Sequence, residues 1–169
     1  SGSQDKVPYA VSGPISAGAV TLPPDVSSQY LSALALAASR LEGTTTITAQ
    51  APVASRPYLD ITTQVAAAFG VQIDLRDTDE ATTLTVHGPQ PPTCPPAGYT
   101  VASDWSSAAF PLVAGVVLGV PVVLDGVDRR SPQGDAAIVD VLGCFGVRTS
   151  WDATGKVLKM IPRKPRNPG

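Results

Sequence analysis

The sequence contains little of what metal, disulfide and membrane proteins require. Its 169 residues include two cysteines and one histidine, and a single histidine argues against a site built on several imidazole ligands. No apolar run reaches the roughly 20 residues that span a bilayer, and residues 1–6 lack the apolar segment of a signal peptide. We therefore expect a soluble protein of a reducing compartment, without a metal and without a membrane partner.

Charge is also sparse. Charged residues make up 15% of the chain and the net charge is −2, which argues against a non-specific nucleic-acid binder. The apolar fraction of 43% is typical of globular proteins, and the length allows one domain or two small ones with a real core. Cys94 lies in a proline-rich stretch and Cys144 in an apolar helical pattern, so we favour a loop thiol and a core residue over a disulfide.

One unit is repeated along the chain. The pentapeptide DVSSQ that starts at Asp25 recurs 79 residues later, at Asp104, as DWSSA. The tripeptide FGV that starts at Phe69 recurs 76 residues later, at Phe145. A period of this length is too long for a solenoid and fits a duplicated small subdomain. Between the copies, the proline-rich residues 89–97 are predicted to form a stiff linker.

Each copy predicts the order strand, helix, strand, helix, strand, strand. The expected fold is α/β, an α+β sandwich of two βαβαββ units, each a small sheet with two helices on one face. The predicted units are residues 8–88 and 98–162, and a basic tail follows at residues 163–169. The predicted strands are residues 18–22, 44–48, 71–75, 82–87, 99–101, 120–124, 147–151 and 156–161. The predicted helices are residues 28–41, 57–69 and 106–118, and one opened by residues 131–132.

Apolar spacing also predicts which side of each helix faces the core. The residues expected to point inward are Leu31, Leu34, Ala38 and Leu41 in the first helix, Tyr58, Ile61, Val65 and Phe69 in the second, Phe110, Val113 and Val117 in the third, and Ile138, Val141, Leu142 and Phe145 in the fourth.

Small hydroxyl side chains mark two helix starts in the first unit. Ser27 and Ser28 precede the first predicted helix, and Ser55 precedes Pro57 at the start of the second. The free backbone N–H groups of a first helical turn attract anions, so two such starts together can hold a phosphorylated, hydroxyl-rich small molecule. Taken alone, a serine at a helix start is more often only an N-cap.

These motifs together resemble a known family. The segments SSQ at Ser27, SRPY at Ser55, DWSSAAF at Asp104 and QGD at Gln133 occur in the order, and close to the spacing, of the EPSP synthases (3-phosphoshikimate 1-carboxyvinyltransferases), an enolpyruvyl transferase family. The resemblance covers nearly the whole chain but only a central portion of the family's length.

The resemblance implies that several of these side chains contact shikimate 3-phosphate. Hydroxyls and an amide at a helix start can donate to phosphate oxygens and exchange hydrogen bonds with ring hydroxyls, and a tyrosine can pack on a carbocycle. The substrate-binding residues implied are Ser27, Ser28, Gln29, Ser55 and Tyr58. Tyr58 has the alternative of being an inward residue of its helix, and Arg56 is either a cation beside the phosphate or a solvated residue.

The second copy of the helix start is expected to be structural. Asp104, Ser106 and Ser107 imitate the first copy, but Ala108 stands where the amide would be. Asp128 and Asp135 have no basic partner that the sequence identifies, so we expect solvated or helix-start roles for them.

The family transfers the enolpyruvyl group of phosphoenolpyruvate to shikimate 3-phosphate, in chorismate and aromatic amino-acid biosynthesis, without a metal or other cofactor. Its lysine–serine motif, phosphoenolpyruvate-binding arginines and proton acceptor have no counterpart here, so we assign no catalytic residue and expect no activity from this chain by itself. The alternative function is a non-catalytic binding module, or a split-enzyme subunit, for a phosphorylated cyclitol.

The resemblance also implies partners and a location. The expected partners are shikimate 3-phosphate, phosphoenolpyruvate only together with further segments, and a complementary fragment or a second copy of the chain; no nucleic acid is expected. The expected location is the cytoplasm, or the plastid in a photosynthetic eukaryote.

Overall fold

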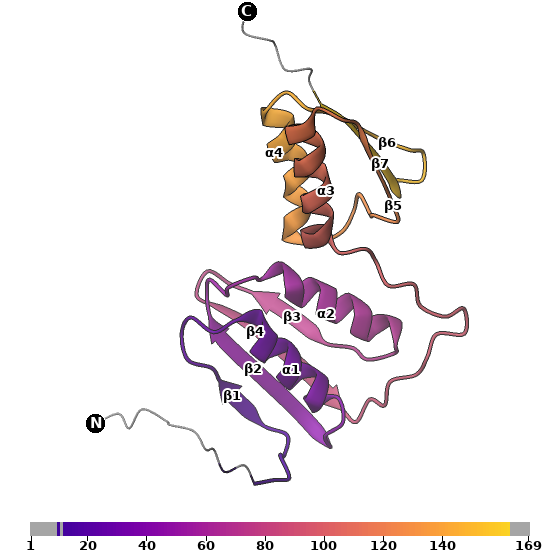
Figure 1. Ribbon diagram of the computed structural model, residues 1–169. Helices are drawn as coiled ribbons and strands as arrows, with labels where there is room; N and C mark the ends of the chain where they lie inside the picture. Colours follow the sequence, from indigo (N-terminus) through magenta and orange to yellow (C-terminus); the bar gives the residue numbers. More distant parts are fainter. Residues whose placement is uncertain (1–9, 11, 163–169) are drawn as a thin grey trace, which may run out of the picture.

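The first unit is a four-stranded sheet with two helices on one face (Figure 1). The computed structural model describes residue 10 and residues 12–162. The elements of this unit are β1 (Ala19–Thr21), α1 (Ser28–Ala38), β2 (Gly43–Gln50), α2 (Pro57–Ala68), β3 (Asp74–Asp77) and β4 (Ala81–Gly88). The strand order is β1-β2-β4-β3, with β1 parallel to β2 and the other pairs antiparallel. The two consecutive strands predicted at residues 71–75 and 82–87 are found as β3 and β4, and they pair as an antiparallel hairpin.

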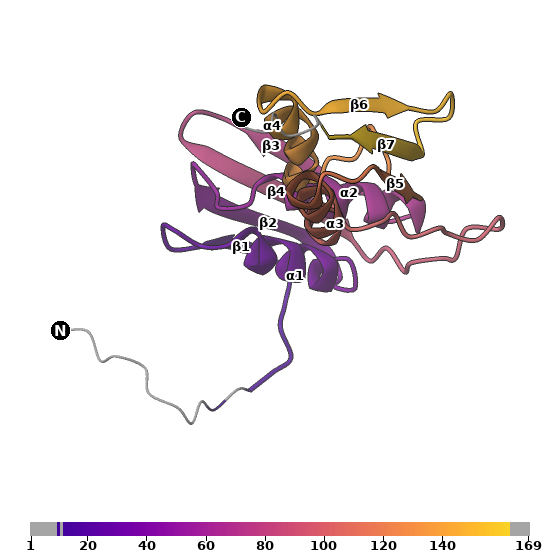
Figure 2. The same cartoon turned by 45° about the horizontal axis from the view of Figure 1, so that its top comes forward.

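The second unit has a three-stranded sheet, again with two helices on one side (Figure 2). Its elements are α3 (Trp105–Leu118), β5 (Val122–Asp125), the 3₁₀-helix η1 (Gly134–Ala137), α4 (Ile138–Cys144), β6 (Arg148–Trp151) and β7 (Val157–Ile161). The order is β5-β7-β6, and both pairs are antiparallel. The mixed fold class predicted from the sequence is therefore confirmed.

Each unit buries its own hydrophobic core. In the first, β2 and β4 alternate between buried and half-buried positions, which places Ile47 and Leu84 against Leu31 of α1 and Leu59 of α2. In the second, Leu112 of α3 packs with residues of β7 and with Trp105, whose ring meets that of Trp151 edge-on at 6.0 Å. No helix among the described residues is long and apolar enough to cross a membrane.

The strand predicted at residues 99–101 is wrong. This segment has no regular structure, and Val101 is 82% exposed. Tyr99 packs instead on Phe69, at the end of α2, with ring centroids 5.4 Å apart. Tyr99, predicted to lie in a strand of the second unit, thus packs on the first unit, and the second unit lacks a counterpart of β1. Figure 1 shows this part of the chain as a long loop beside the two units.

The predicted inward faces of three helices also need correction. In α3, Phe110 and Val117 are 78% exposed, while Leu112 and Trp105 are buried. In α4, Val141 and Phe145 are exposed, and in α2 Tyr58 is exposed while Leu59 is buried. These helices carry apolar residues on more than one side, so periodicity alone does not choose the face that packs. For α1 the predicted face is confirmed at Leu31 and Ala38.

Both cysteines are free and exposed. Cys94 therefore matches the predicted loop thiol, whereas Cys144, predicted as a core residue, lies at the solvent-exposed end of α4. Three parts of the sequence predictions lie outside the described residues. They are the basic tail at residues 163–169, residues 1–6, and residues 8, 9 and 11 of the predicted first unit.

Candidate functional site

The two helix starts of the first unit lie side by side because a short parallel bridge joins them. Ser27 pairs with Ala54 in this bridge, and the Ser28 N–H donates to the Ala54 carbonyl at 3.1 Å. The bridge continues the direction of the parallel β1–β2 pair after the ends of these strands. Residues 27 and 54, far apart in the sequence, are thereby held together at one end of the sheet.

The first turn of α1 has no free N–H groups to offer to an anion. The Ser28 N–H donates to Ala54, the Gln29 N–H donates to the Ser27 hydroxyl at 3.3 Å, and the Tyr30 N–H donates to the Ser27 carbonyl at 3.1 Å. This corrects the expectation that free backbone donors of this turn form the site. A ligand here would meet side chains, above all the exposed Gln29 amide and the half-buried Ser27.

Ser28 is almost fully buried, with 1% of its surface exposed. The helix start therefore presents Ser27 and Gln29 to solvent and places Ser28 beneath them. Of the first helix's predicted contacts, Ser28 is the one that a ligand can reach least.

The start of α2 is held in an unusual backbone conformation. Ser55 has φ = +58°, a left-handed value that costs a residue with a side chain of order 1–3 kcal/mol. Its carbonyl accepts the Tyr58 N–H at 3.0 Å, so this conformation begins the first helical turn. Asp25, just before α1, has φ = +62°. Among the described residues these are the two non-glycine positions with positive φ, and each precedes one of the two helix starts.

Arg56 is engaged by carboxylates, an outcome that neither sequence interpretation foresaw. Its guanidinium lies 2.6 Å from Asp77 Oδ2 and 3.0 Å from Asp60 Oδ1. The Nε–H also donates to Asp77, giving a two-pronged contact. The guanidinium, and next the Thr82 hydroxyl, hold the pKa of Asp77 below its ordinary value. Arg56 thus ties the start of α2 to the β3–β4 hairpin.

Tyr58 is 44% exposed, so the alternative that it is an inward residue of its helix is wrong. Its hydroxyl donates to Asp135 Oδ2 of the second unit at 3.4 Å. Sequence reasoning missed this partner, although the QGD tripeptide was a visible signal. Asp128, for which the sequence offered no partner, forms an ion pair with Lys156.

The corresponding helix start of the second unit is satisfied internally, as expected of a structural cap. The Asp104 carboxylate accepts the N–H groups of Ser106 and Ser107 at 3.1 and 3.2 Å. It also accepts their hydroxyls at 2.7 and 2.6 Å. The hydroxyl bonds, that of Ser107 first, lower the pKa of Asp104 to about 2. Both serine hydroxyls therefore already donate a hydrogen bond within the cap.

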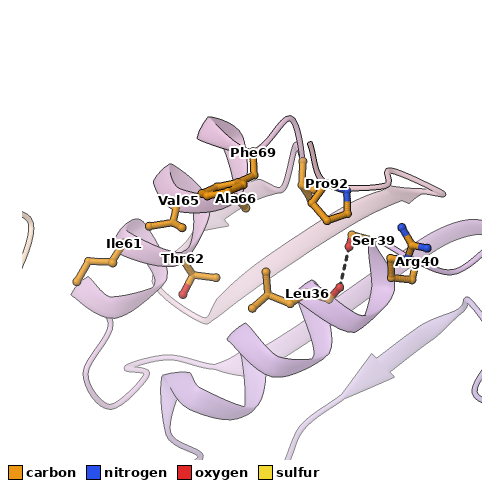
Figure 3. Close-up of a pocket in the computed structure, with 10 residues that line it drawn as sticks. Leu36, Ser39, Arg40, Ile61, Thr62, Val65, Ala66, Phe69 and Pro92 are labelled. Carbon is orange, nitrogen blue, oxygen red and sulfur yellow. Dashed lines mark hydrogen bonds between the residues drawn. The ribbon is translucent and has the colours of Figure 1, made fainter. Parts of the chain in front are cut away.

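A separate apolar groove of about 500 Å³ lies between α1 and α2 (Figure 3). Leu36, Val65, Phe69 and Pro92 are among its lining residues, and it lies toward the C-terminal halves of both helices. Its lining is mostly apolar, which does not suit a phosphorylated compound. The polar residues at the helix starts remain the candidate site.

Comparison with known proteins identifies the family. The sequence profile described as EPSP synthase (3-phosphoshikimate 1-carboxyvinyltransferase) matches residues 1–166. The chain belongs to the EPSP synthase family. It is 40% identical to a 3-phosphoshikimate 1-carboxyvinyltransferase of Halobacterium salinarum over 156 residues, which are 90% of this chain and 35% of that protein. It is 38% identical to the enzyme of the same name from Erwinia tasmaniensis, over 85% of this chain and 33% of that protein.

Solved EPSP synthase structures share the fold. An EPSP synthase from Acinetobacter baumannii aligns with a TM-score of 0.58 and 26% identity, over 88% of this chain and 32% of that one. A second structure of an EPSP synthase from this organism has a TM-score of 0.61 and 24% identity. The chain therefore spans about a third of the length of the EPSP synthases that it matches.

Proposed function

We propose that this chain is part of a 3-phosphoshikimate 1-carboxyvinyltransferase and carries part of its shikimate 3-phosphate site. The observation that carries the proposal is the Ser27–Ala54 bridge, which brings two serine-bearing helix starts together at one end of the sheet. Family membership supplies the substrate class, since the relatives are named for action on 3-phosphoshikimate.

In this proposal the side chains at the two helix starts contact different parts of the substrate. The Ser27 and Ser55 hydroxyls donate to the phosphate, and the Gln29 amide can donate to an oxygen of the phosphate while accepting from a ring hydroxyl. The ring of Tyr58, which stands 44% exposed in the first turn of α2, packs on the carbocycle. The strained φ of Ser55 supports a functional role, because a costly backbone conformation persists where its geometry is needed.

Arg56 is a weaker candidate for direct contact, because Asp60 and Asp77 already compensate its charge. We propose that it supports the site by fixing the first turn of α2. Binding of phosphoenolpyruvate and transfer of its enolpyruvyl group need cations and proton-transfer groups that converge on both substrates. We assign these to parts of the enzyme beyond the third of its length that this chain represents.

Titration of the chain with shikimate 3-phosphate, followed by amide NMR, tests the proposal. Because the chain supplies only part of the site, we expect weak binding. A dissociation constant in the millimolar range corresponds to a binding free energy of about −4 kcal/mol. Amide signals of residues 27–29 and of Ser55, Arg56 and Tyr58 should shift in a saturable way. Shikimate without the phosphate should shift them less at the same concentration.

Matched variants separate the site from a general effect of the ligand. The double variant Ser27→Ala, Ser55→Ala should weaken binding at least tenfold, because it removes two phosphate donors. The double variant Ser106→Ala, Ser107→Ala in the second unit should bind like the wild type. Shifts confined to residues 104–108, or no saturable shifts at all, would contradict the proposed site.

A further inference from the structure

The tripeptide Gln133-Gly134-Asp135 lies where the two units meet, and the proposed function gives it no role. Gln133 immediately precedes the 3₁₀-helix η1, and Asp135 is in the first turn of that helix. It is one of the motifs by which the sequence resembles its family. It contacts the start of α3 in its own unit and the start of α2 in the first unit.

In one direction, the Gln133 side chain holds the chain as it enters the second unit. Its Nε2–H donates to the Ser103 carbonyl at 2.9 Å, and its Oε1 accepts the Trp105 N–H at 2.8 Å. The amide is half-buried and uses both a donor and its acceptor. In the first unit the equivalent helix N–H, that of Ser28, donates to the backbone carbonyl of Ala54. Gln133 therefore fixes the tripeptide to the start of α3.

In the other direction, the tripeptide meets the start of α2. The Tyr58 hydroxyl donates to Asp135 Oδ2 at 3.4 Å. A Cβ placed on Gly134 would lie 3.9 Å from Pro57 Cγ, so the backbone of the tripeptide comes close to the first turn of α2 at a second point. Both contacts fall on the helix start that bears Ser55, one of the proposed substrate contacts.

We propose that Asp135 and Gln133 are positioning residues for the substrate site, Asp135 by orienting the ring of Tyr58 and Gln133 by holding Asp135 in place. A tyrosine ring that is 44% exposed has few neighbours to fix its side-chain torsions, and a bond to its hydroxyl selects one orientation. The second unit thereby contributes to a substrate wall whose other residues all come from the first. The inference rests on the proposed function for its substrate, but the Tyr58–Asp135 link can be tested without one.

The first experiment uses the ligand-free chain. Asp135→Ala should shift the ring signals of Tyr58 in NMR spectra, whereas Asp140→Ala, which removes an exposed carboxylate five residues further on, should leave them unchanged. Gln133→Glu replaces an N–H donor facing the Ser103 carbonyl with an oxygen of similar shape. It should shift signals of residues 103–105 and also those of Tyr58. An unmoved Tyr58 ring in Asp135→Ala would overturn the proposal whether or not the chain binds a substrate.

The second experiment measures shikimate 3-phosphate binding by these variants. Asp135→Ala should weaken binding three- to tenfold, and Asp135→Asn, which keeps an acceptor for the Tyr58 hydroxyl, should restore it. In the background of Tyr58→Phe, which lacks the hydroxyl, Asp135→Ala should have no further effect. If the carboxylate acted only through repulsion of the phosphate, both Asp135 variants would bind more tightly, and that result would refute the positioning role.

The two experiments separate the two proposals. A wild-type chain that binds no shikimate 3-phosphate would contradict the proposed function and the substrate role of Asp135 together, while the ligand-free spectra still decide the Tyr58–Asp135 link. Normal binding with an unmoved Tyr58 ring would contradict the further inference alone.

Discussion

The first helices of the two units begin with different N-cap residues, Ser27 in α1 and Asp104 in α3. Ser27 caps α1 with one hydroxyl oxygen, and Asp104 caps α3 with a carboxylate that accepts two N–H groups and two hydroxyls. The residue after each cap, Ser28 or Trp105, is 1% exposed. Its N–H is bound by the Ala54 carbonyl in the first unit and by the Gln133 side chain in the second.

Aligning the two units on their N-caps changes the spacing of the repeat. The N-caps Ser27 and Asp104 are 77 residues apart, close to the 76 that separate Phe69 from Phe145. The 79-residue match of DVSSQ with DWSSA is therefore out of register by two residues. Ser106 and Ser107 do not correspond to Ser27 and Ser28. The comparison teaches that the charged cap engages the hydroxyls of both following serines, whereas the serine cap accepts one backbone N–H and leaves the exposed Gln29 amide outside the cap.

The largest expected effect tests whether the two cores are independent. Leu31→Ala in the first core and Leu112→Ala in the second should each cost about 2–5 kcal/mol of unfolding free energy, because both side chains are fully buried. Both tryptophans belong to the second unit, so their fluorescence reports its unfolding. In urea titrations Leu112→Ala should shift the fluorescence midpoint, and Leu31→Ala should shift only the amide signals of the first unit.

The control for this experiment is the wild type followed by both probes. Leu31→Ala shifting the fluorescence midpoint as far as it shifts the amide signals would show a single cooperative body, contrary to the separate cores described above.

A smaller effect is expected where the two first helices differ in the size of a buried residue. Gly115 of α3 occupies the place of Ala38 in α1. A Cβ at Gly115 would overlap Val122 Cγ2 and lie 2.8 Å from Met160 Cε. Overpacking should cost about 1–3 kcal/mol, and the roughly 1 kcal/mol that alanine gains over glycine in a helix offsets part of this cost, so Gly115→Ala should destabilise the second unit by up to about 2 kcal/mol. Fluorescence-detected urea unfolding measures it.

The matched change in the other unit is Ala38→Gly, which should cost less than about 1 kcal/mol in helix propensity, because Ala38 is the last residue of α1, and should also lose a buried methyl group. If Gly115→Ala instead stabilised the second unit, the tight contact of α3 with β5 and β7 would be wrong.

The smallest effect concerns the ion pairs that brace each hairpin. Asp77→Asn should cost less than about 1 kcal/mol, because the Asp77 side chain is 46% exposed and solvent screens its pair with Arg56. The depressed pKa of Asp77 means that this contribution is present above its ordinary value of 3.8 and is lost as pH falls through the folded-state value. Urea unfolding at pH 6 and under progressively more acidic conditions should show the wild type losing its advantage over the variant.

Asp128→Asn is the counterpart in the second unit, where Lys156 replaces the arginine. Its effect should be smaller, because an ammonium group lacks the two-pronged geometry of Arg56. A larger loss from Asp128→Asn than from Asp77→Asn would reverse this ranking.

The sequence by itself determined the features that depend on neighbours along the chain. The paired strands that close each unit were predictable from local alternation, and Asp104 was identifiable as a cap because its partners are two and three residues away. Motif order also predicted the family. The resemblance named the helix starts of the candidate site, which remains a prediction in its contacts with substrate.

Only the tertiary structure decided which of these local possibilities are used. It left residues 99–101 outside the sheet because Tyr99 packs on Phe69, and it chose Leu112 over Phe110 for the core. It also paired the first-turn N–H groups of α1 with oxygens of the protein, and it brought the Tyr58 hydroxyl to Asp135. Each outcome depends on partners distant in sequence or on competition between apolar faces of one helix, and local periodicity contains neither kind of information.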